Sequence, residues 1–305
     1  MSRGARGYCG RFAPSPTGPL HAGSLLAAVA SYLDARAQGG RWLVRIDDID
    51  TLRTVPGASD RILAMLEALA LHWDGEVVYQ SGRTPAYEAA FAALKQLGVV
   101  YECSCSRREI ARITGPAAPG SELRYPGTCR AGPRRPASEH AWRLRVPTGQ
   151  VEFEDRCQGP QAFDVAATVG DFIVKRRDGP FAYQLAVVVD DAEAGVDHVV
   201  RGRDLLDNTP RQVLLYRALG LPEPQYAHVP VLVDRSGRKL SKSTQATAVD
   251  PRDPSAALFR SLARLGQAPP VELRNASPAA ILEWGVAHWQ LAGVAGREEV
   301  RLQEP

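Results

Sequence analysis

The sequence predicts an α/β fold in which helices cover both faces of a doubly wound parallel sheet. Short strand-like and helix-like segments alternate along the opening part of the chain, which is the order that a parallel sheet requires. The same alternation returns after a stretch rich in Gly, Pro and Arg. With 305 residues, 45% of them apolar, the chain is also long enough to bury a sizeable core without disulfides.

Each expected element is a short apolar run bounded by Gly, Pro or Asp. In the first half we expect strands at 8–12, 42–46 and 77–79 and helices at 25–37, 61–71 and 85–97. Later we expect strands at 171–176 and 197–202, a helix at 209–219, a strand ahead of the polar loop in 228–243, and helices at 254–265 and 278–291. The chain thus divides into 1–100 and 166–245 as two halves of one nucleotide-binding domain, 101–165 as an inserted module, and 246–305 as a short helical C-terminal segment.

Charge and composition exclude several classes of protein. Lys and Arg number 37 against 34 Asp and Glu, a formal charge of +3, which excludes a dedicated polycation. The apolar and charged fractions are close to average and argue against an extensive disordered tail. The first ten residues lack an apolar targeting core, and no run approaches the roughly 20 apolar residues of a membrane span, so we expect a cytoplasmic location.

Two motifs favour phosphate chemistry. Residues 14–24, PSPTGPLHAGS, form a turn that aims the N–H groups of a helix N-terminus at an anion, and His21 adds a donor for a phosphate oxygen. Residues 238–243, RKLSKS, place Lys239 and Lys242 on a short loop, where mobile ammonium groups suit a pyrophosphate leaving group. Alone, the first motif is as typical of a Pro-rich surface turn as of a phosphate site, and the second is more typical of a solvated basic loop. Their pairing, about 220 residues apart, favours the phosphate interpretation.

With HAGS at 21–24 and KLSKS at 239–243, the chain resembles the class I aminoacyl-tRNA synthetases, whose signatures are HIGH and KMSKS. The strings RFAPSPTGPLHAGS, RWLVRIDDID, LHWDG and FAYQLAVVVDD are similar to the glutamyl branch, and the likeness covers about residues 8–245. The resemblance implies a Rossmann-like catalytic domain that converts glutamate and ATP, with Mg²⁺, to glutamyl adenylate. It assigns catalysis to His21 and Lys242, and ATP binding to His21, Gly23, Ser24, Lys239 and Lys242.

The same resemblance implies a glutamate site. Glutamate has two carboxylates and one ammonium group; Arg11 and Arg201 would hold the carboxylates. Asp47 would hold the ammonium group and Tyr183 would add a hydroxyl, although Asp47 is one methylene shorter than the glutamate common in similar enzymes. Surface salt bridging is the alternative, but both arginines end expected strands, where open α/β sheets place ligands. The implied set is Arg11, Phe12, Ala13, Pro14, Ser15, Asp47, Tyr183 and Arg201.

Three of the five cysteines cluster in the inserted module. Thiolates are good zinc ligands, and Cys103, Cys105 and Cys129 suggest one structural Zn²⁺ site with four protein ligands. In the glutamyl-queuosine synthetases, which this pattern resembles, a tyrosine four residues before the last cysteine is the fourth ligand, which implies Tyr125 here. His140 and Cys157 are rivals for that place, and three free cysteines in a loop without metal are the remaining alternative.

The end of the chain separates the members of the glutamyl branch. The 55 residues after position 250 are expected to be too few for an independent anticodon-binding domain. With the tyrosine and cysteine pattern, this resembles the glutamyl-queuosine tRNA(Asp) synthetases, which implies glutamate activation without tRNA and glutamyl transfer to queuosine, the wobble base of tRNA(Asp). The expected partners are ATP, L-glutamate and queuosine-containing tRNA(Asp), and the expected state is a monomer. A truncated glutamyl-tRNA synthetase charging a tRNA 3′ end and a non-catalytic RNA-binding paralogue are the alternatives.

Overall fold

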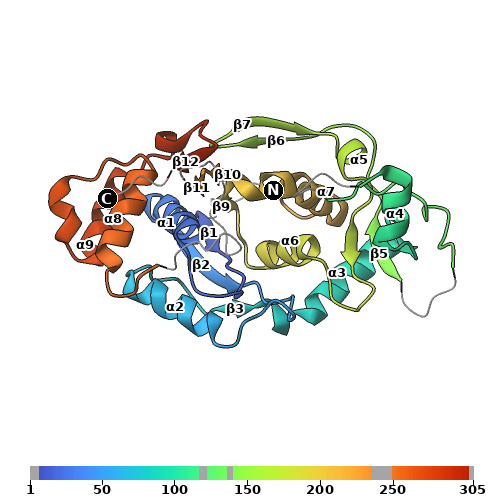
Figure 1. Cartoon of the computed structure of the whole chain (residues 1–305), viewed down its shortest axis with the longest axis horizontal. Coiled ribbons are helices and arrows are strands. Elements are labelled where there is room, and N and C mark those ends of the chain that lie inside the picture. Colours follow the sequence, from blue (N-terminus) through green and yellow to red (C-terminus); the bar gives the residue numbers. More distant parts are fainter. Residues whose placement is uncertain (1–6, 117–121, 136–139, 235–248, 302–305) are drawn as a thin grey trace.

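Two groups of parallel strands form the centre of the molecule (Figure 1). The computed structural model describes residues 7–116, 122–135, 140–234 and 249–301. The first group joins β1 (Cys9–Phe12), β2 (Arg41–Ile46) and β3 (Val78–Tyr79). The second joins β9 (His198–Gly202), β10 (Gln225–Val229) and β6 (Val151–Asp155), with β7 (Gly159–Phe163) antiparallel at its edge. β1 lies against β9, and the Asp197 N–H donates to the Cys9 carbonyl at 3.1 Å.

Helices cover the parallel strands on two sides. α1 (Ala22–Ala37) packs on β1, β2 and β9, and α8 (Pro254–Arg264) and α9 (Pro278–His288) pack on α1. α2 (Ala58–Ala68) contributes Ile62 and Leu66 to the same core cluster. A second cluster contains residues of α3 (Thr84–Gln96), α6 (Tyr183–Glu193) and α7 (Thr209–Leu219). Phe12 lies in the first cluster and Cys9 in the second, so β1 separates two cores and the predicted α/β fold with parallel strands is confirmed.

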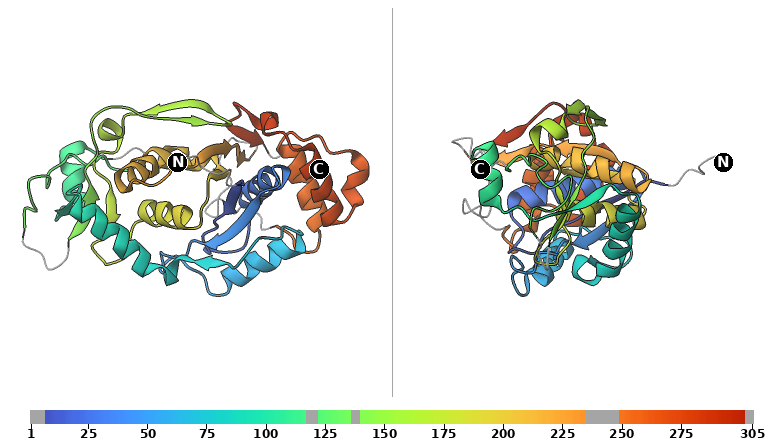
Figure 2. Two further views of the ribbon diagram at one scale, coloured as in Figure 1. Left: turned by 180° about the vertical axis from the view of Figure 1, so that it is seen from behind. Right: turned by 90° about the vertical axis from the view of Figure 1, so that its right-hand side faces the viewer.

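A third, antiparallel sheet lies in the part of the molecule that contains the clustered cysteines, and Cys103 is the last residue of its first strand. It consists of β4 (Val100–Cys103), β5 (Ala141–Leu144) and β8 (Ile173–Lys175), with α4 (Arg107–Thr114) and α5 (Val165–Thr168) nearby. The views in Figures 1 and 2 place this sheet and the helices α8 and α9 at opposite ends of the long axis. β8 was expected where the α/β alternation resumes, yet it pairs with β5, whereas β6, from the last part of the expected insertion, joins the parallel strands. The limits at 100, 165 and 245 stay predictions.

Most expected elements form, with differences that have local causes. α1 begins three residues earlier than expected because His21 caps it at position 21. α2 ends at Ala68 because Ala70 has a left-handed φ of 55°. α6 was not predicted: most of its residues are buried, so its apolar residues show no helical period. The expected C-terminal helices form, and β12 (Glu299–Arg301) pairs with β11 (Val231–Val233) beyond them. Within the part of the chain that the structure describes, short 3₁₀ segments lie at Gln80–Gly82, Arg203–Asn208, Val271–Asn275 and Leu291–Val294.

Among the helices that the structure describes, none is both long and apolar enough to cross a bilayer.

Candidate functional site

A cavity of about 560 Å³ opens at the carboxyl ends of β1 and β9. This is the edge at which parallel α/β sheets bind their ligands. Most of the residues that the sequence predicted for ATP and glutamate line it: Arg11, Phe12, Ala13, Pro14, Ser15, His21, Gly23, Ser24, Tyr183 and Arg201. Asp47 lines a second cavity of about 870 Å³, which reaches the cysteine-bearing module and shares Ser15, Thr17, Arg53 and Tyr183 with the first. The two cavities are therefore adjoining compartments.

The Pro- and Gly-rich turn ends at the N-terminus of α1, which faces the first cavity. His21 is the N-cap: its Nδ1 accepts from the Ser24 N–H at 3.3 Å, and its Nε2 lies 3.0 Å from Ser24 Oγ. Gly18 has a φ of 142°, a conformation that glycine adopts readily, where the chain turns toward the helix. Since Gly23 and Ser24 also line the cavity, the positive end of the helix dipole is available to an anion.

A buried network of two arginines and two aspartates supports the wall beside β1 and β2. Arg11 Nε donates to both oxygens of Asp191, each at 3.2 Å. Arg45 joins the two acids, with its Nη1 2.6 Å from Asp191 Oδ1 and its Nε 2.6 Å from Asp47 Oδ1. Burial raises the pKa of Asp47 to about 6, although Arg45 acts in the opposite direction. The carboxyl of Asp47 therefore titrates close to neutral pH.

Arg201 approaches the cavity from β9 and is held on two of its three edges. Its Nε donates to His228 Nε2 at 3.0 Å, and its Nη2 donates to Thr209 Oγ1 and Gln212 Oε1, each at 2.8 Å. Its Nη1 is buried and has no hydrogen-bond partner among the described residues. Tyr183, the first residue of α6, lines the wall that both cavities share.

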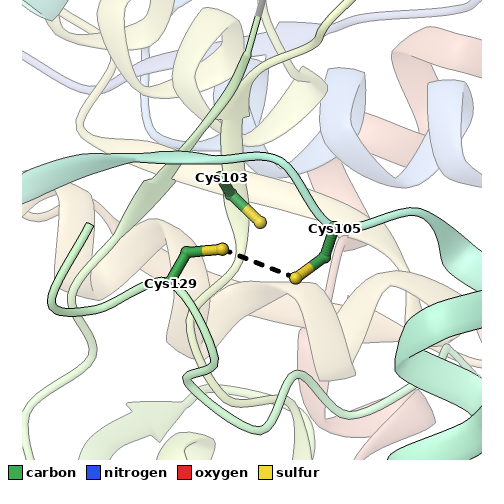
Figure 3. A group of neighbouring side chains, drawn as sticks. All are labelled: Cys103, Cys105 and Cys129. Atoms are coloured by element: carbon green, nitrogen blue, oxygen red, sulfur yellow. Dashed lines mark hydrogen bonds between the residues drawn. The ribbon is translucent and has the colours of Figure 1, made fainter. Parts of the chain in front are cut away.

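Cys103, Cys105 and Cys129 converge in the antiparallel module (Figure 3). Their sulfur atoms lie within 4.8 Å of one another, with Cys105 and Cys129 3.5 Å apart. The Tyr125 hydroxyl lies 3.3 Å from Cys103 Sγ and 3.8 Å from Cys105 Sγ. Arg143 contacts this group with its Nε 3.2 Å from Cys103 Sγ. Cys157, by contrast, belongs to the large core cluster around α1.

This set of donors fits a thiophilic metal such as zinc. Burial alone would raise the pKa of Cys129, but hydrogen bonds from the Tyr125 hydroxyl and the Ser104 backbone lower it to about 6. Cys129 is then largely a thiolate at neutral pH, the form that binds metal. Cys105 is the reverse case, since burial raises its pKa to about 11, and bound metal would displace its proton. The other rival ligand, His140, instead faces Glu102, its Nδ1 3.5 Å from Oε2.

Residues 9–277 match the family described as "tRNA synthetases class I (E and Q), catalytic domain". The glutamyl-Q tRNA(Asp) synthetase of Aromatoleum aromaticum is 55% identical over 287 residues, which cover 94% of this chain and 90% of that protein. The enzyme of that name from Thiobacillus denitrificans is 53% identical over 296 residues, covering 97% and 98%. The chain belongs to the glutamyl-Q tRNA(Asp) synthetases. The family resemblance seen in HAGS and KLSKS is thereby confirmed.

Solved structures agree with this membership at the level of the fold. A glutamate tRNA ligase from Elizabethkingia meningosepticum, in complex with its amino acid, is 25% identical and has a TM-score of 0.81 over 98% of this chain and 67% of its own. A glutamate-tRNA synthetase from Elizabethkingia anophelis is 24% identical with the same TM-score, over 98% and 68%. This chain thus shares its fold with these two glutamate-specific enzymes.

In this chain the KLSKS motif, with Lys239 and Lys242, lies outside the described residues. The described residues before and after it both reach the wall of the first cavity. Leu232 lines that cavity, and the Val249 N–H donates to the Leu20 carbonyl at 2.9 Å, directly before His21.

Four residues that support the site were missed from the sequence. Arg45 and Asp191 stand within RWLVRIDDID and FAYQLAVVVDD, so those strings carried a signal that could have marked them. No comparable sequence signal marks Asp155 and His228. His228 is a lone histidine in an apolar strand, and Asp155 lies in the expected insertion. Their link to Arg201 depends on the pairing of β6, β10 and β9, which a single sequence does not show.

Proposed function

We propose that the chain activates L-glutamate with ATP, without tRNA, and transfers the glutamyl group to queuosine at the wobble position of tRNA(Asp). One observation carries the activation step: a single cavity combines two buried arginines with the N-terminus of α1. Arginines bind carboxylates such as those of glutamate, and helix N-termini bind phosphate groups such as those of ATP. The cavity therefore offers complementary groups to both substrates of an adenylation reaction. The names of the similar proteins support the transfer step.

For glutamate, Arg11 and Arg201 bind the two carboxylates. Asp191 holds one edge of Arg11, and Arg201 has a buried Nη1 available for a ligand oxygen. Asp47 binds the ammonium group from the neighbouring compartment, and the Tyr183 hydroxyl closes the wall between the two. The remaining residues proposed to bind glutamate form the floor of the cavity: Phe12, Ala13, Pro14 and Ser15.

For ATP, the first turn of α1 at Gly23 and Ser24 receives a phosphate group and His21 donates to a phosphate oxygen. A carboxylate oxygen of glutamate attacks the α-phosphorus; the bond from that phosphorus to the bridging oxygen breaks and pyrophosphate leaves with the electron pair. No protein nucleophile is needed, because positioning and charge stabilisation lower the barrier. Lys242, assisted by Lys239, stabilises the pyrophosphate, and Mg²⁺ arriving with ATP would supply further positive charge for the phosphates.

The adjoining cavity of about 870 Å³ provides room for a nucleotide beside the adenylate. It extends from Asp47 to Cys105 and Arg107 of the module, so an anticodon loop held by the module can present its base to the activated carboxyl group. Zn²⁺ held by Cys103, Cys105, Cys129 and Tyr125 is structural in this proposal: it fixes the loop after β4 next to the cavity.

The activation step is tested by ATP–pyrophosphate exchange with tRNA omitted. We expect exchange that depends on L-glutamate and is much weaker with glutamine or aspartate, because glutamine lacks the second carboxylate and aspartate is one methylene shorter than the substrate that the two arginines are proposed to hold. Exchange that requires tRNA would contradict this proposal and favour a glutamyl-tRNA synthetase that charges a 3′ end. Absence of exchange with or without tRNA would favour the non-catalytic alternative.

A further inference from the structure

Behind Arg201 lies a buried chain of polar groups that touches no proposed substrate. His228 on β10 is fully buried, and its Nδ1 lies 2.5 Å from Asp155 Oδ2. Asp155 Oδ1 accepts three backbone N–H groups, from Cys157 at 3.0 Å, Gln158 at 2.9 Å and His228 itself at 3.1 Å. With Oδ1 occupied by donors, Oδ2 is the oxygen left to accept from the imidazole.

These contacts fix the tautomer of His228. Burial lowers its pKa to about 4, so the ring is neutral and carries one proton. The Nδ1–H donates to Asp155 Oδ2, so the ring proton lies on Nδ1 and Nε2 is left as an acceptor. Arg201 Nε donates to this Nε2 at 3.0 Å. In many metal sites a carboxylate accepts a hydrogen bond from one nitrogen of a histidine and so orients its other nitrogen toward the metal. Asp155 and His228 are arranged in the same way, but the guanidinium of Arg201 occupies the place of the metal.

The arrangement differs from that of the other buried arginines at the site. Arg11 and Arg45 are paired directly with carboxylates, and their charge is largely compensated inside the protein. Among the ion pairs of the described residues, none includes Arg201: its partners are the neutral groups of His228, Thr209 and Gln212. A neutral acceptor orients the guanidinium of Arg201 but does not compensate its positive charge. The Nη1 group, which has no partner among the described residues, can then bind a ligand oxygen.

We propose that His228, oriented by Asp155, is a positioning residue for Arg201 that keeps its guanidinium aimed at a substrate carboxylate with its charge uncompensated. The proposal rests on the assignment of this cavity to glutamate. It also gives the β6–β7 hairpin a role, since Asp155 ends β6 and this hairpin is the element that brings it to the parallel strands.

The test is glutamate and ATP kinetics in the exchange reaction for three variants. In His228→Asn the amide can still donate to Asp155, but the acceptor for Arg201 is lost. In Asp155→Asn the side-chain oxygen keeps the three backbone donors, and the amide hydrogens face Nδ1, so the imidazole proton moves to Nε2 and opposes the Arg201 N–H. We expect both to raise the KM for glutamate by about 10- to 100-fold, with the KM for ATP within about twofold. His228→Gln, whose amide oxygen can reach Arg201, is expected to recover much of the loss.

The matched control is His198→Asn. His198 also pairs with an aspartate, Nδ1 to Asp197 Oδ1 at 2.7 Å, but stacks on Tyr8 and does not contact Arg201. Its KM for glutamate is expected to stay at the wild-type value. Equal effects on glutamate and ATP, or an unchanged KM for glutamate in His228→Asn, would overturn the proposal, whereas an inactive wild type would refute the proposed function instead.

A second readout covers variants that fail to fold. In the wild-type protein, the ¹⁵N chemical shifts of the His228 ring report which nitrogen carries the proton. A protonated Nδ1 and an unprotonated Nε2 are expected at neutral pH, and a protonated Nε2 would overturn the proposal whatever the variants do.

Discussion

At the residue scale, His21 caps α1 and, in the proposed mechanism, also donates to a phosphate oxygen. His21→Asn separates the two roles, because asparagine is a good N-cap whose oxygen can accept from the Ser24 N–H. We expect the turnover of ATP–pyrophosphate exchange to fall about 100-fold or more while the melting temperature changes little. Ser277→Asn at the N-cap of α9, far from the cavity, is the matched control and should change neither quantity. Full activity in His21→Asn would leave the imidazole with a capping role alone.

In the proposed mechanism, Asp47 makes glutamate binding depend on pH. Its pKa is raised by burial to about 6, and only the ionised carboxylate attracts the ammonium group. The kcat/KM for glutamate is therefore expected to rise as pH increases through about 6 and to level off above it. Asp47→Asn should bind glutamate more weakly and lose this step. A step of the same size in Asp47→Asn would assign the titration to another group.

The membership of a residue in the cavity wall was predictable where a local string marks the residue, whereas contacts that depend on strand pairing were not predictable. Arg11, His21 and Tyr183 stand in strings typical of the family, and each lines the cavity. Asp47 stands in such a string too, but the structure places it in the neighbouring compartment and ties it to Arg45. The contact of His228 with Arg201 joins positions 27 residues apart across two strands, which no local pattern encodes.

At the element scale, the loop that carries Tyr125 is held in place by Gly170. Tyr125 and Gly170 form an isolated β-bridge, and a Cβ at Gly170 would lie 2.1 Å from the Tyr125 carbonyl oxygen. Gly170→Ala must therefore displace Tyr125 from the cysteine cluster. We expect the affinity for zinc, measured by competition with a chelator, to fall about tenfold or more.

The control for Gly170→Ala is Gly75→Ala, because the two glycines share the same backbone strain. Gly170 has a φ of 71° and Gly75 one of 72°, but no atom lies within 4 Å of a Cβ at Gly75. Gly75→Ala should cost about 1 kcal/mol of stability and leave zinc affinity unchanged. Equal zinc affinities in the two variants would remove Tyr125 from the proposed ligand set.

The elements were predictable where a local signal marks them and ambiguous where burial is extensive and no such signal is present, or where partners are distant. Helix 209–219 was predicted with the bounds of α7 although most of its residues are buried, because the early Pro210 favours a helix start. α6 is buried along most of its length as well, but it was missed because it begins after Ala182 without a side-chain cap. The expected strand at 171–176 forms as β8, but its partner β5 could not be read from its own residues, since strand pairing depends on the whole chain.

At the scale of the whole molecule, Asp34 ties the C-terminal segment to the catalytic core. It accepts from Tyr8 Oη at 2.5 Å, Arg156 Nη1 at 2.6 Å and Trp289 Nε1 at 2.9 Å, so α1, the start of β1, the β6–β7 hairpin and the end of α9 meet at one carboxylate. Asp34→Asn is expected to lower the free energy of unfolding by about 3 kcal/mol, because it leaves Arg156 without its ion pair. Asp250→Asn, at an exposed pair with Arg252, should leave the melting temperature unchanged.

The Asp34 contribution also has a predictable pH dependence. Burial opposes ionisation, but hydrogen bonds from Arg156, Tyr8 and Trp289 lower the pKa of Asp34 below its ordinary value. The stabilisation is therefore complete above the unfolded pKa of about 4 and is lost as pH falls through the folded value. In chemical denaturation the difference between wild type and Asp34→Asn should shrink in acid. A difference that stays constant down to pH 2 would contradict this assignment.

The measurement that tests the proposed reaction most directly is to map where labelled glutamate is attached. The enzyme is incubated with radiolabelled glutamate, ATP and tRNA(Asp) in four forms, with and without queuosine and with and without the 3′-terminal adenosine, and the tRNA is then digested and the labelled nucleotide identified. We predict label on the queuosine nucleotide whether or not the terminal adenosine is present, and none on tRNA(Asp) that lacks queuosine. Label that disappears with the terminal adenosine, or that does not require queuosine, would contradict it.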